Sequence, residues 1–227
     1  MEFDAILAKQ YDSGIRRTLP TYDSMLRLIQ TFLRANVSDP GARLLVVGAG
    51  GGNEVIGFGS NNPEWTFTGV DPSEGMLAVA KQKCDEVGLS GRVTLVQGTV
   101  EDICTETTFN AATCILVLHF IQSYEDKLKT LKEIHARLKH AAPFVLVSKY
   151  GDPTSAEFQE RLKLWKSYWL DTTKLNVEEV DKMEQDILSL SYVTEEGIEQ
   201  LLQEAGFVRV AKFFSTTLFG GWICHKL

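Results

Sequence analysis

The 227 residues suffice for one domain with a full hydrophobic core, and 44% apolar with 23% charged residues is typical of a globular protein. The formal net charge of −7 disfavours a broad phosphate-binding surface, so we expect neither DNA nor tRNA as a substrate. Because no CxxC pair and no run of eighteen apolar residues occurs, we predict a cytoplasmic protein without a metal site or membrane segment.

Residues 2–36 are predicted to be helical, in two pieces that are broken near Pro20. Apolar residues at helical spacing would form one buried stripe on the second piece: Met25, Leu26, Leu28, Ile29, Phe32 and Leu33. The hinge between the pieces carries tyrosines and arginines, which include Arg17 and Tyr22. Contact with a ligand is one interpretation of these side chains, and a solvated surface charge is the other for Arg17. We expect residues 1–36 to form a lid.

From residue 43 the pattern alternates between strands and helices. The predicted strands are 43–47, 65–70, 92–96, 110–117 and 143–149, and the predicted helices between them are 52–59, 73–87 and 124–140. Strands that are separated by helical segments predict parallel βαβ units in a doubly wound, Rossmann-like sheet.

The first of these strands ends in a cluster of glycines at positions 48, 50, 51 and 52. A helix then begins near Glu54, and its free N–H groups would point back at the turn. Asp71 follows the second strand. This arrangement indicates a nucleotide-type binding site, because glycines let a ligand approach the backbone without meeting a Cβ.

Residues 151–190 depart from the alternation and suggest a helical insertion over the C-terminal edge of the sheet. Its aromatic residues fit an amphipathic helix pair that packs on the core, or a substrate pocket lined by Trp165, Tyr168 and Trp169. After a helix from Thr194 to Gly206, strands at 207–215 and 218–225 predict an antiparallel hairpin at a sheet edge. We therefore expect one domain over residues 1–227, with a seven-stranded sheet.

Glycine turns of this kind serve both dinucleotide and S-adenosylmethionine sites. The GxGxxG spacing of dinucleotide sites has Asn53 in place of its last glycine here. The order of motifs resembles the class I S-adenosylmethionine-dependent methyltransferases over nearly the whole chain. The motifs that carry this resemblance are residues 47–52, 70–76, 96–102, 116–120 and 202–207.

The resemblance implies S-adenosyl-L-methionine as the cofactor and assigns contacts to particular residues. They are Gly48, Ala49, Gly50 and Gly52 in the turn, Asp71 on the ribose hydroxyls, Pro72 and Met76 on the adenine, Thr99 and Val100 at its edge, and Leu116 beneath the amino group. Acids are common in the family at two positions that here hold Val46 and Thr99. Glu54 or Asp102 would take over those polar roles.

A closer resemblance exists to the carboxy-S-adenosylmethionine synthases, carried by the segment Arg17–Tyr22, which places Tyr22 on the cofactor. Those enzymes hold an extra carboxylate with an arginine in the insertion, and the matching residues Asp181–Glu184 include none, although Lys182 is cationic. We therefore predict methyl transfer to a small-molecule acceptor. The alternatives are a synthase-like enzyme of tRNA modification and a non-catalytic partner protein that binds S-adenosylmethionine.

Two residues are candidates for contact with the reacting acceptor. His119 follows the fourth predicted strand at the edge where substrates bind, and it would serve as a general base for an acceptor that must lose a proton. The alternative for His119 is a core or helix-start residue. Tyr11 would face the substrate or belong only to the lid. The sequence specifies neither the acceptor nor an oligomeric state.

Overall fold

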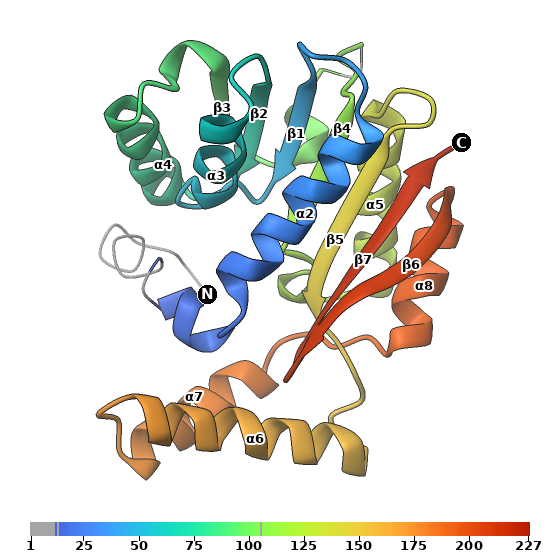
Figure 1. The fold of residues 1–227 in the computed structure, drawn as a ribbon. Coiled ribbons are helices and arrows are strands. Elements are labelled where there is room, and N and C mark those ends of the chain that lie inside the picture. The colour runs from blue at the N-terminus through green and yellow to red at the C-terminus, as the bar shows by residue number, and fades with distance from the viewer. Residues whose placement is uncertain (1–11, 13, 105) are drawn as a thin grey trace.

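The computed structural model describes residues 12, 14–104 and 106–227 of the chain. Within them, a sheet runs in the order β3-β2-β1-β4-β5-β7-β6 (Figure 1). The strands are β1 (Arg43–Val47), β2 (Thr66–Asp71), β3 (Val93–Gln97), β4 (Ala111–Ile115), β5 (Pro143–Lys149), β6 (Phe207–Thr216) and β7 (Phe219–Lys226). The first five pair in parallel, whereas β7 is antiparallel to both β5 and β6. The predicted Rossmann-like sheet with a terminal antiparallel hairpin is confirmed.

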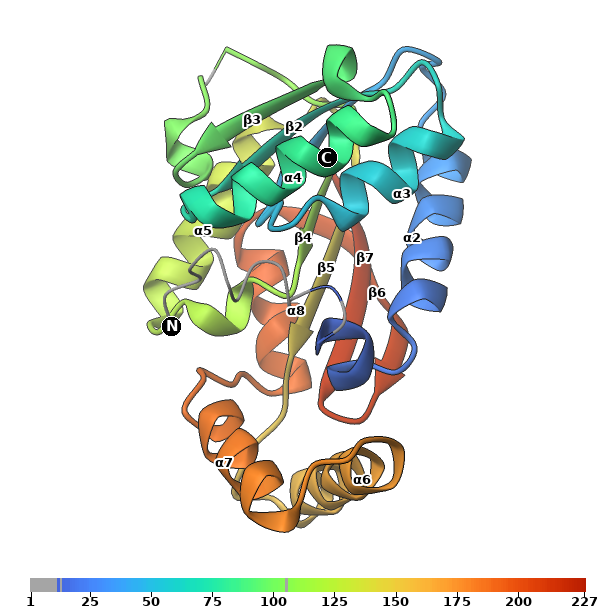
Figure 2. The same ribbon diagram turned by 90° about the vertical axis from the view of Figure 1, so that its left-hand side faces the viewer.

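Helices cover both faces of this sheet (Figure 2). One face packs against α2 (Tyr22–Asn36), α3 (Asn53–Asn61) and α4 (Glu74–Glu86), and the other against α5 (Tyr124–Arg137) and α8 (Glu195–Glu204). The hydrophobic core accordingly consists of two clusters, one on each face. All seven residues of β5 are buried, because this strand is central and covered on both sides.

Polar caps fix where several helices begin. The Ser73 hydroxyl accepts a hydrogen bond from the Met76 N–H at 3.2 Å, as predicted for the start of α4. Thr194 caps α8 in the same way through the N–H of Gly197 at 3.2 Å. These caps set the register with which each helix meets the sheet.

Two local expectations are wrong in detail. The predicted strand 110–117 stops at Ile115, because Leu116 takes a positive φ of 61° and turns the chain out of the sheet. Leu28 is 52% exposed, since it points away from the buried stripe of α2. Cys104 is exposed, whereas the other three cysteines are buried thiols.

The insertion forms α6 (Ala156–Thr172) and α7 (Val177–Leu188), which lie beyond the C-terminal ends of β4 and β5 (Figure 1). Trp165 and Trp169 are buried, and the indole N–H of Trp165 donates to the Thr18 carbonyl oxygen at 3.1 Å. The insertion therefore packs against the segment that precedes α2, as an amphipathic helix pair would. No helix in the described part of the chain has the length and apolar character needed to cross a membrane.

Candidate functional site

The chain between β1 and α3 is a tight turn built on left-handed backbone. Gly48, Gly50 and Gly52 have φ values of 71°, 49° and 81°. A Cβ on Gly48 would lie 2.1 Å from a methyl carbon of Val117, and one on Gly52 would lie 3.1 Å from the Ala80 backbone in α4. Glycine is therefore required at position 48 by the close approach of Val117. At position 52 it is required by the packing of α3 against α4, which supports the turn.

Two cavities meet at this turn, and Gly48 lines both. The larger, of about 210 Å³, extends toward the ends of β2 and β3 and is lined by residues that include Pro72, Thr99 and Val100. The smaller, of about 20 Å³, is lined by Tyr22, Gly48, Ala49, Gly50, Gly51, Asn53, Glu54, Ile115 and Leu116. Most of the predicted cofactor residues are thus brought together around one turn, in two separate compartments.

Asp71, at the end of β2, is fastened to the glycine turn. One carboxylate oxygen accepts from the Gly50 N–H and the other from the Ser73 N–H, each at 2.9 Å. Burial raises the pKa of Asp71, and these two backbone hydrogen bonds oppose the rise. The carboxylate therefore holds the turn in shape while it remains partly accessible at the mouth of the site.

Glu54 is the second acid of the site and is buried beneath the turn. The Thr113 hydroxyl of β4 donates to one of its carboxyl oxygens at 2.7 Å. Burial raises the pKa of Glu54 to about 8, and the Thr113 hydrogen bond opposes that rise. Val46, where the family commonly has an acid, is buried in β1. Glu54 thus supplies carboxyl oxygens beneath the glycine turn, where Val46 supplies none.

Asp102 lies behind Thr99, which lines the larger cavity. One of its oxygens accepts from the Thr99 N–H at 2.7 Å and from the Thr99 hydroxyl at 3.3 Å, in a capping box. Asp102 therefore stabilises the turn that bears Thr99. The side chain of Met76 lies close to Gly50: a Cβ built on Gly50 would be 3.2 Å from the Met76 methyl carbon.

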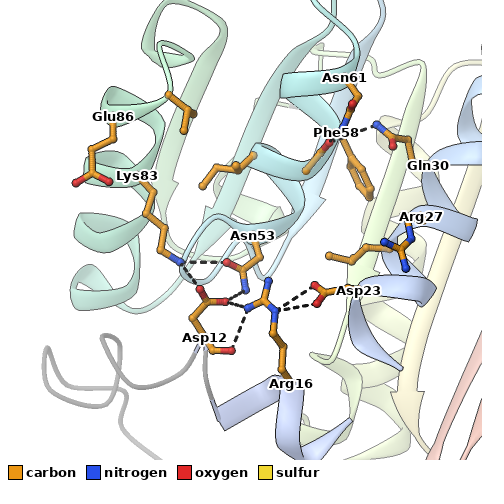
Figure 3. A pocket seen from close by; sticks show the side chains of 14 residues that line it. Asp12, Arg16, Asp23, Arg27, Gln30, Asn53, Phe58, Asn61, Lys83 and Glu86 are labelled. Carbon is orange, nitrogen blue, oxygen red and sulfur yellow. Dashed lines mark hydrogen bonds and ion pairs between the residues drawn. The ribbon is translucent and has the colours of Figure 1, made fainter. Parts of the chain in front are cut away.

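Charged residues hold the segment before α2 against the turn (Figure 3). The Asp12 carboxylate accepts from the Asn53 amide at 2.7 Å and lies 3.4 Å from the Lys83 ammonium. Arg16 pairs with both Asp12 and Asp23. Figure 3 shows these side chains converging beside a groove of about 550 Å³ between α2, α3 and α4.

The predicted hinge residues have different positions. Tyr22 is buried and lines the smaller cavity, whereas Arg17 is exposed. Tyr11 lies outside the described residues. In place of Arg17, its neighbour Arg16 makes the contacts with this region, and its guanidinium lies 5.5 Å from the Tyr22 ring centre.

Comparison with known proteins agrees with this geometry. Residues 44–141 match a family model described as a methyltransferase domain. The carboxy-S-adenosyl-L-methionine synthase of Wolinella succinogenes is 26% identical, over 99% of this chain and 93% of that protein. The carboxy-S-adenosyl-L-methionine synthase 1 of Yersinia pseudotuberculosis is 28% identical with the same coverage.

The chain is thus similar to methyltransferases over residues 44–141 and to carboxy-S-adenosyl-L-methionine synthases over nearly its whole length. Magnesium protoporphyrin IX methyltransferase of Synechocystis, solved with bound S-adenosylhomocysteine, has a TM-score of 0.67 at 15% identity, over 93% of this chain and 86% of that one. A Nostoc punctiforme structure matches 91% of this chain with a TM-score of 0.67 at 16% identity, but this chain spans only 57% of it. The fold of this chain is shared with both.

His119 lies in a 3₁₀ turn after β4 and is only 2% exposed. Its Nδ1 accepts from the Lys149 backbone N–H at 3.3 Å and lies 3.2 Å from the Ser148 hydroxyl. Burial, with the charges of Lys149 and Lys127, holds the pKa of His119 well below its usual value. This geometry favours the core-residue interpretation of His119, because its accepting nitrogen is occupied within the protein itself.

Lys149, at the end of β5, is a candidate functional residue that the sequence does not reveal. It is buried, and burial lowers its pKa to about 7. A lysine at the end of a strand is ordinarily a surface residue, whereas the Lys149 ammonium here lies over the Phe219 ring of β7. No sequence motif indicates this burial.

Proposed function

We propose that the protein transfers the methyl group of S-adenosylmethionine to a small-molecule acceptor at the glycine turn, on the side toward α6–α7. The observation that carries this proposal is the pair of cavities that share Gly48 at the turn, which the Asp71 carboxylate holds through the Gly50 N–H. Such a division suits a ligand with a flat, mostly apolar base at one end and a charged amino acid at the other.

Each compartment has residues of the required chemistry. Asp71 would accept hydrogen bonds from ribose hydroxyls, and Pro72, Thr99 and Val100 would surround the adenine. In the smaller compartment Glu54 would face the ammonium group of the donor, together with the backbone of Leu116 and Tyr22. A carboxyl group that is costly to ionise when buried becomes easier to ionise beside an ammonium.

The donor supplies an electrophilic methyl group on a sulfonium. A lone pair of the acceptor forms the new bond to the methyl carbon while the carbon–sulfur bond breaks and its electrons remain on sulfur. A proton on the acceptor atom leaves to solvent or to a base. The protein's contribution is to align the two groups and to exclude water, which the insertion and the segment before α2 would do.

A second candidate function is synthesis or use of a carboxylated donor, as the names of the Wolinella and Yersinia relatives suggest for those proteins. The residues that match their carboxylate-binding arginine argue against it. Asp181 and Glu184 both pair with Lys166, at 2.7 and 2.5 Å, and Lys182 is exposed. The local charge in α7 is thus mainly negative.

Native mass spectrometry of the purified protein, followed by calorimetry and an acceptor screen, tests the proposal. We expect S-adenosylmethionine or S-adenosylhomocysteine to bind, and S-adenosylhomocysteine to form when a suitable acceptor is added. A carboxylated donor retained through purification would favour the second candidate. Binding without turnover of any acceptor would favour a non-catalytic partner protein, and failure to bind either compound would refute the proposal.

A further inference from the structure

The Lys149 side chain is a buried cation whose charge is not balanced. The residue is 8% exposed, and in the part of the chain that the structure describes no carboxylate or other acceptor is bonded to its ammonium. Its contact is with the face of Phe219, whose ring centre lies 5.7 Å from Nζ. Burying an ammonium without a counter-charge is unfavourable, so such a group is a candidate for binding an anion.

Neighbouring groups provide no such charge. The Lys149 backbone N–H donates to Nδ1 of His119, a ring that burial and two lysines keep neutral. Lys127, the other buried lysine nearby, is hydrogen-bonded to the Ile121 carbonyl and to the Ser191 hydroxyl at 2.9 Å. The two lysines therefore differ: Lys127 holds loops together, and Lys149 has its donors free for another group.

Lys149 is also close to the donor site along the sheet. Val147 pairs with Ile115 in the adjacent strand β4, and the Leu116 N–H donates to the Val147 carbonyl at 2.7 Å. Leu116 lines the smaller cavity at the glycine turn. Lys149 lies two residues beyond Val147 and so shares its face of β5, the face that packs against α2 and Trp165.

We infer that Lys149 binds a carboxylate, and we assign that carboxylate to the methyl acceptor. The inference rests on the proposed function, because it names the substrate class of the same site. An ammonium with free donors forms strong charge-assisted hydrogen bonds with a carboxylate, and the buried setting strengthens them. The acceptor is then a small carboxylic acid whose acid group is held one strand away from the donor.

The test uses the full-length protein saturated with S-adenosylhomocysteine, and compares wild type with Lys149→Met, Lys149→Arg and Lys212→Met. Methionine fits the volume of lysine without its charge, and arginine keeps the charge. Lys212, on strand β6 of the hairpin, serves as the control, because its ammonium already pairs with Glu195 and Tyr150. Circular dichroism checks that each variant is folded.

Calorimetry then measures binding of benzoate, salicylate, phenylacetate and indole-3-acetate, each against its carboxamide. We expect wild type and Lys212→Met to prefer at least one acid by roughly tenfold or more. Lys149→Met should lose that preference, and Lys149→Arg should keep most of it. Absence of any preference in the wild type, or its persistence in Lys149→Met, would overturn the inference.

Two further comparisons distinguish the remaining interpretations of Lys149. If carboxy-S-adenosylmethionine binds wild type more tightly than S-adenosylmethionine and Lys149→Met abolishes this difference, the carboxylate belongs to the donor and the assignment to the acceptor is overturned. If Lys149→Arg loses the preference for the acid as completely as Lys149→Met, the charge of residue 149 does not bind the carboxylate. Failure of S-adenosylhomocysteine to bind at all refutes the proposed function itself, whereas normal binding without an acid preference refutes only the inference.

Discussion

The sides that we propose for the donor and for the acceptor are built in different ways. The donor side consists of a short stretch of chain, residues 46–54, that Asp71 fastens through one backbone hydrogen bond at 2.9 Å. The acceptor side would draw on β5, β7, α6 and the segment before α2, which are far apart in the sequence. The first would recognise its ligand largely with backbone, and the second with side chains that tertiary packing brings together. A cofactor site is therefore recognisable from a motif, and a substrate site is not.

Each side also contains a buried ionisable group with a shifted pKa. Glu54 has the Thr113 hydroxyl as a partner, and its pKa rises to about 8. Among the described residues the Lys149 ammonium contacts the Phe219 ring, and burial lowers its pKa to about 7. Both shifts disfavour the charged form, and a bound ligand of the opposite charge would offset that cost on either side.

The largest effect is expected from closing the donor turn with a methyl group. In Gly48→Ala the new Cβ would overlap Val117 on a left-handed backbone, so donor binding should be abolished and stability lowered by about 3 kcal/mol. Adding Val117→Ala should recover part of both, because it removes the overlap but not the backbone strain. Calorimetry with S-adenosylhomocysteine and urea unfolding measure the two effects.

Gly57→Ala is the matched control, because a Cβ there has open space within a helix. It should leave donor binding unchanged. If Gly48→Ala behaves like Gly57→Ala, the close packing of Val117 on the turn is not required for the site.

The next effect concerns the acid of the donor side. Asp71→Asn removes the charge and one of the acceptors that the turn and the ribose would share, so donor affinity should fall roughly 100-fold, or about 2.7 kcal/mol. Stability should fall by only about 1 kcal/mol. Asp85→Asn, on the exposed side of α4, should change neither. Equal losses of affinity and stability would show that Asp71 acts only as a fastener of the turn.

Glu54→Gln should separate stability from binding. The folded-state pKa of about 8 lies above the ordinary 4.5, so the unfolded state binds fewer protons between these values and stability falls as pH rises through that window. The glutamine variant avoids this loss and should be more stable than wild type at pH 8 by on the order of 1 kcal/mol. Its donor affinity should nevertheless fall about tenfold.

Unfolding at several pH values and calorimetry measure the two opposite changes. The exposed Glu64→Gln variant is the control and should show neither. A Glu54→Gln variant that gains stability and keeps its donor affinity would mean that Glu54 does not contact the donor.

The smallest effect is expected where the two sides meet, at the segment before α2. Asp12→Ala removes the contacts to Asn53 and Lys83 and should weaken donor binding about threefold, because exposed ion pairs contribute little. The difference from wild type should shrink at about 0.5 M NaCl. Asp23→Ala removes only a contact with Arg16 and is the matched control. Identical affinities for both variants would show that closure against Asn53 is unimportant.

The glycine turn, the acid at the end of β2 and the helix starts are predictable from the sequence, because glycine spacing and capping residues act locally. The sequence places the end of β4 wrongly, because the positive φ of Leu116 is imposed by packing and not by residue type. It leaves His119 open as a base or a core residue, because its position after a strand gives no indication that Lys149 and Ser148 occupy its ring. The burial of Lys149 depends on Phe219, seventy residues later, and no local pattern reports such a contact.

The place of β7 between β5 and β6 has a consequence for the order in which the molecule assembles. β6 is made before β7, and β7 is the strand that joins it to the sheet. During synthesis β6 therefore has no partner strand until β7 is made, and β5 lacks one of its two, whereas β1 to β4 already have theirs. Lys149 meets Phe219 through the same late pairing. The donor side is thus complete early in synthesis, and the acceptor side is finished only when β7 enters the sheet.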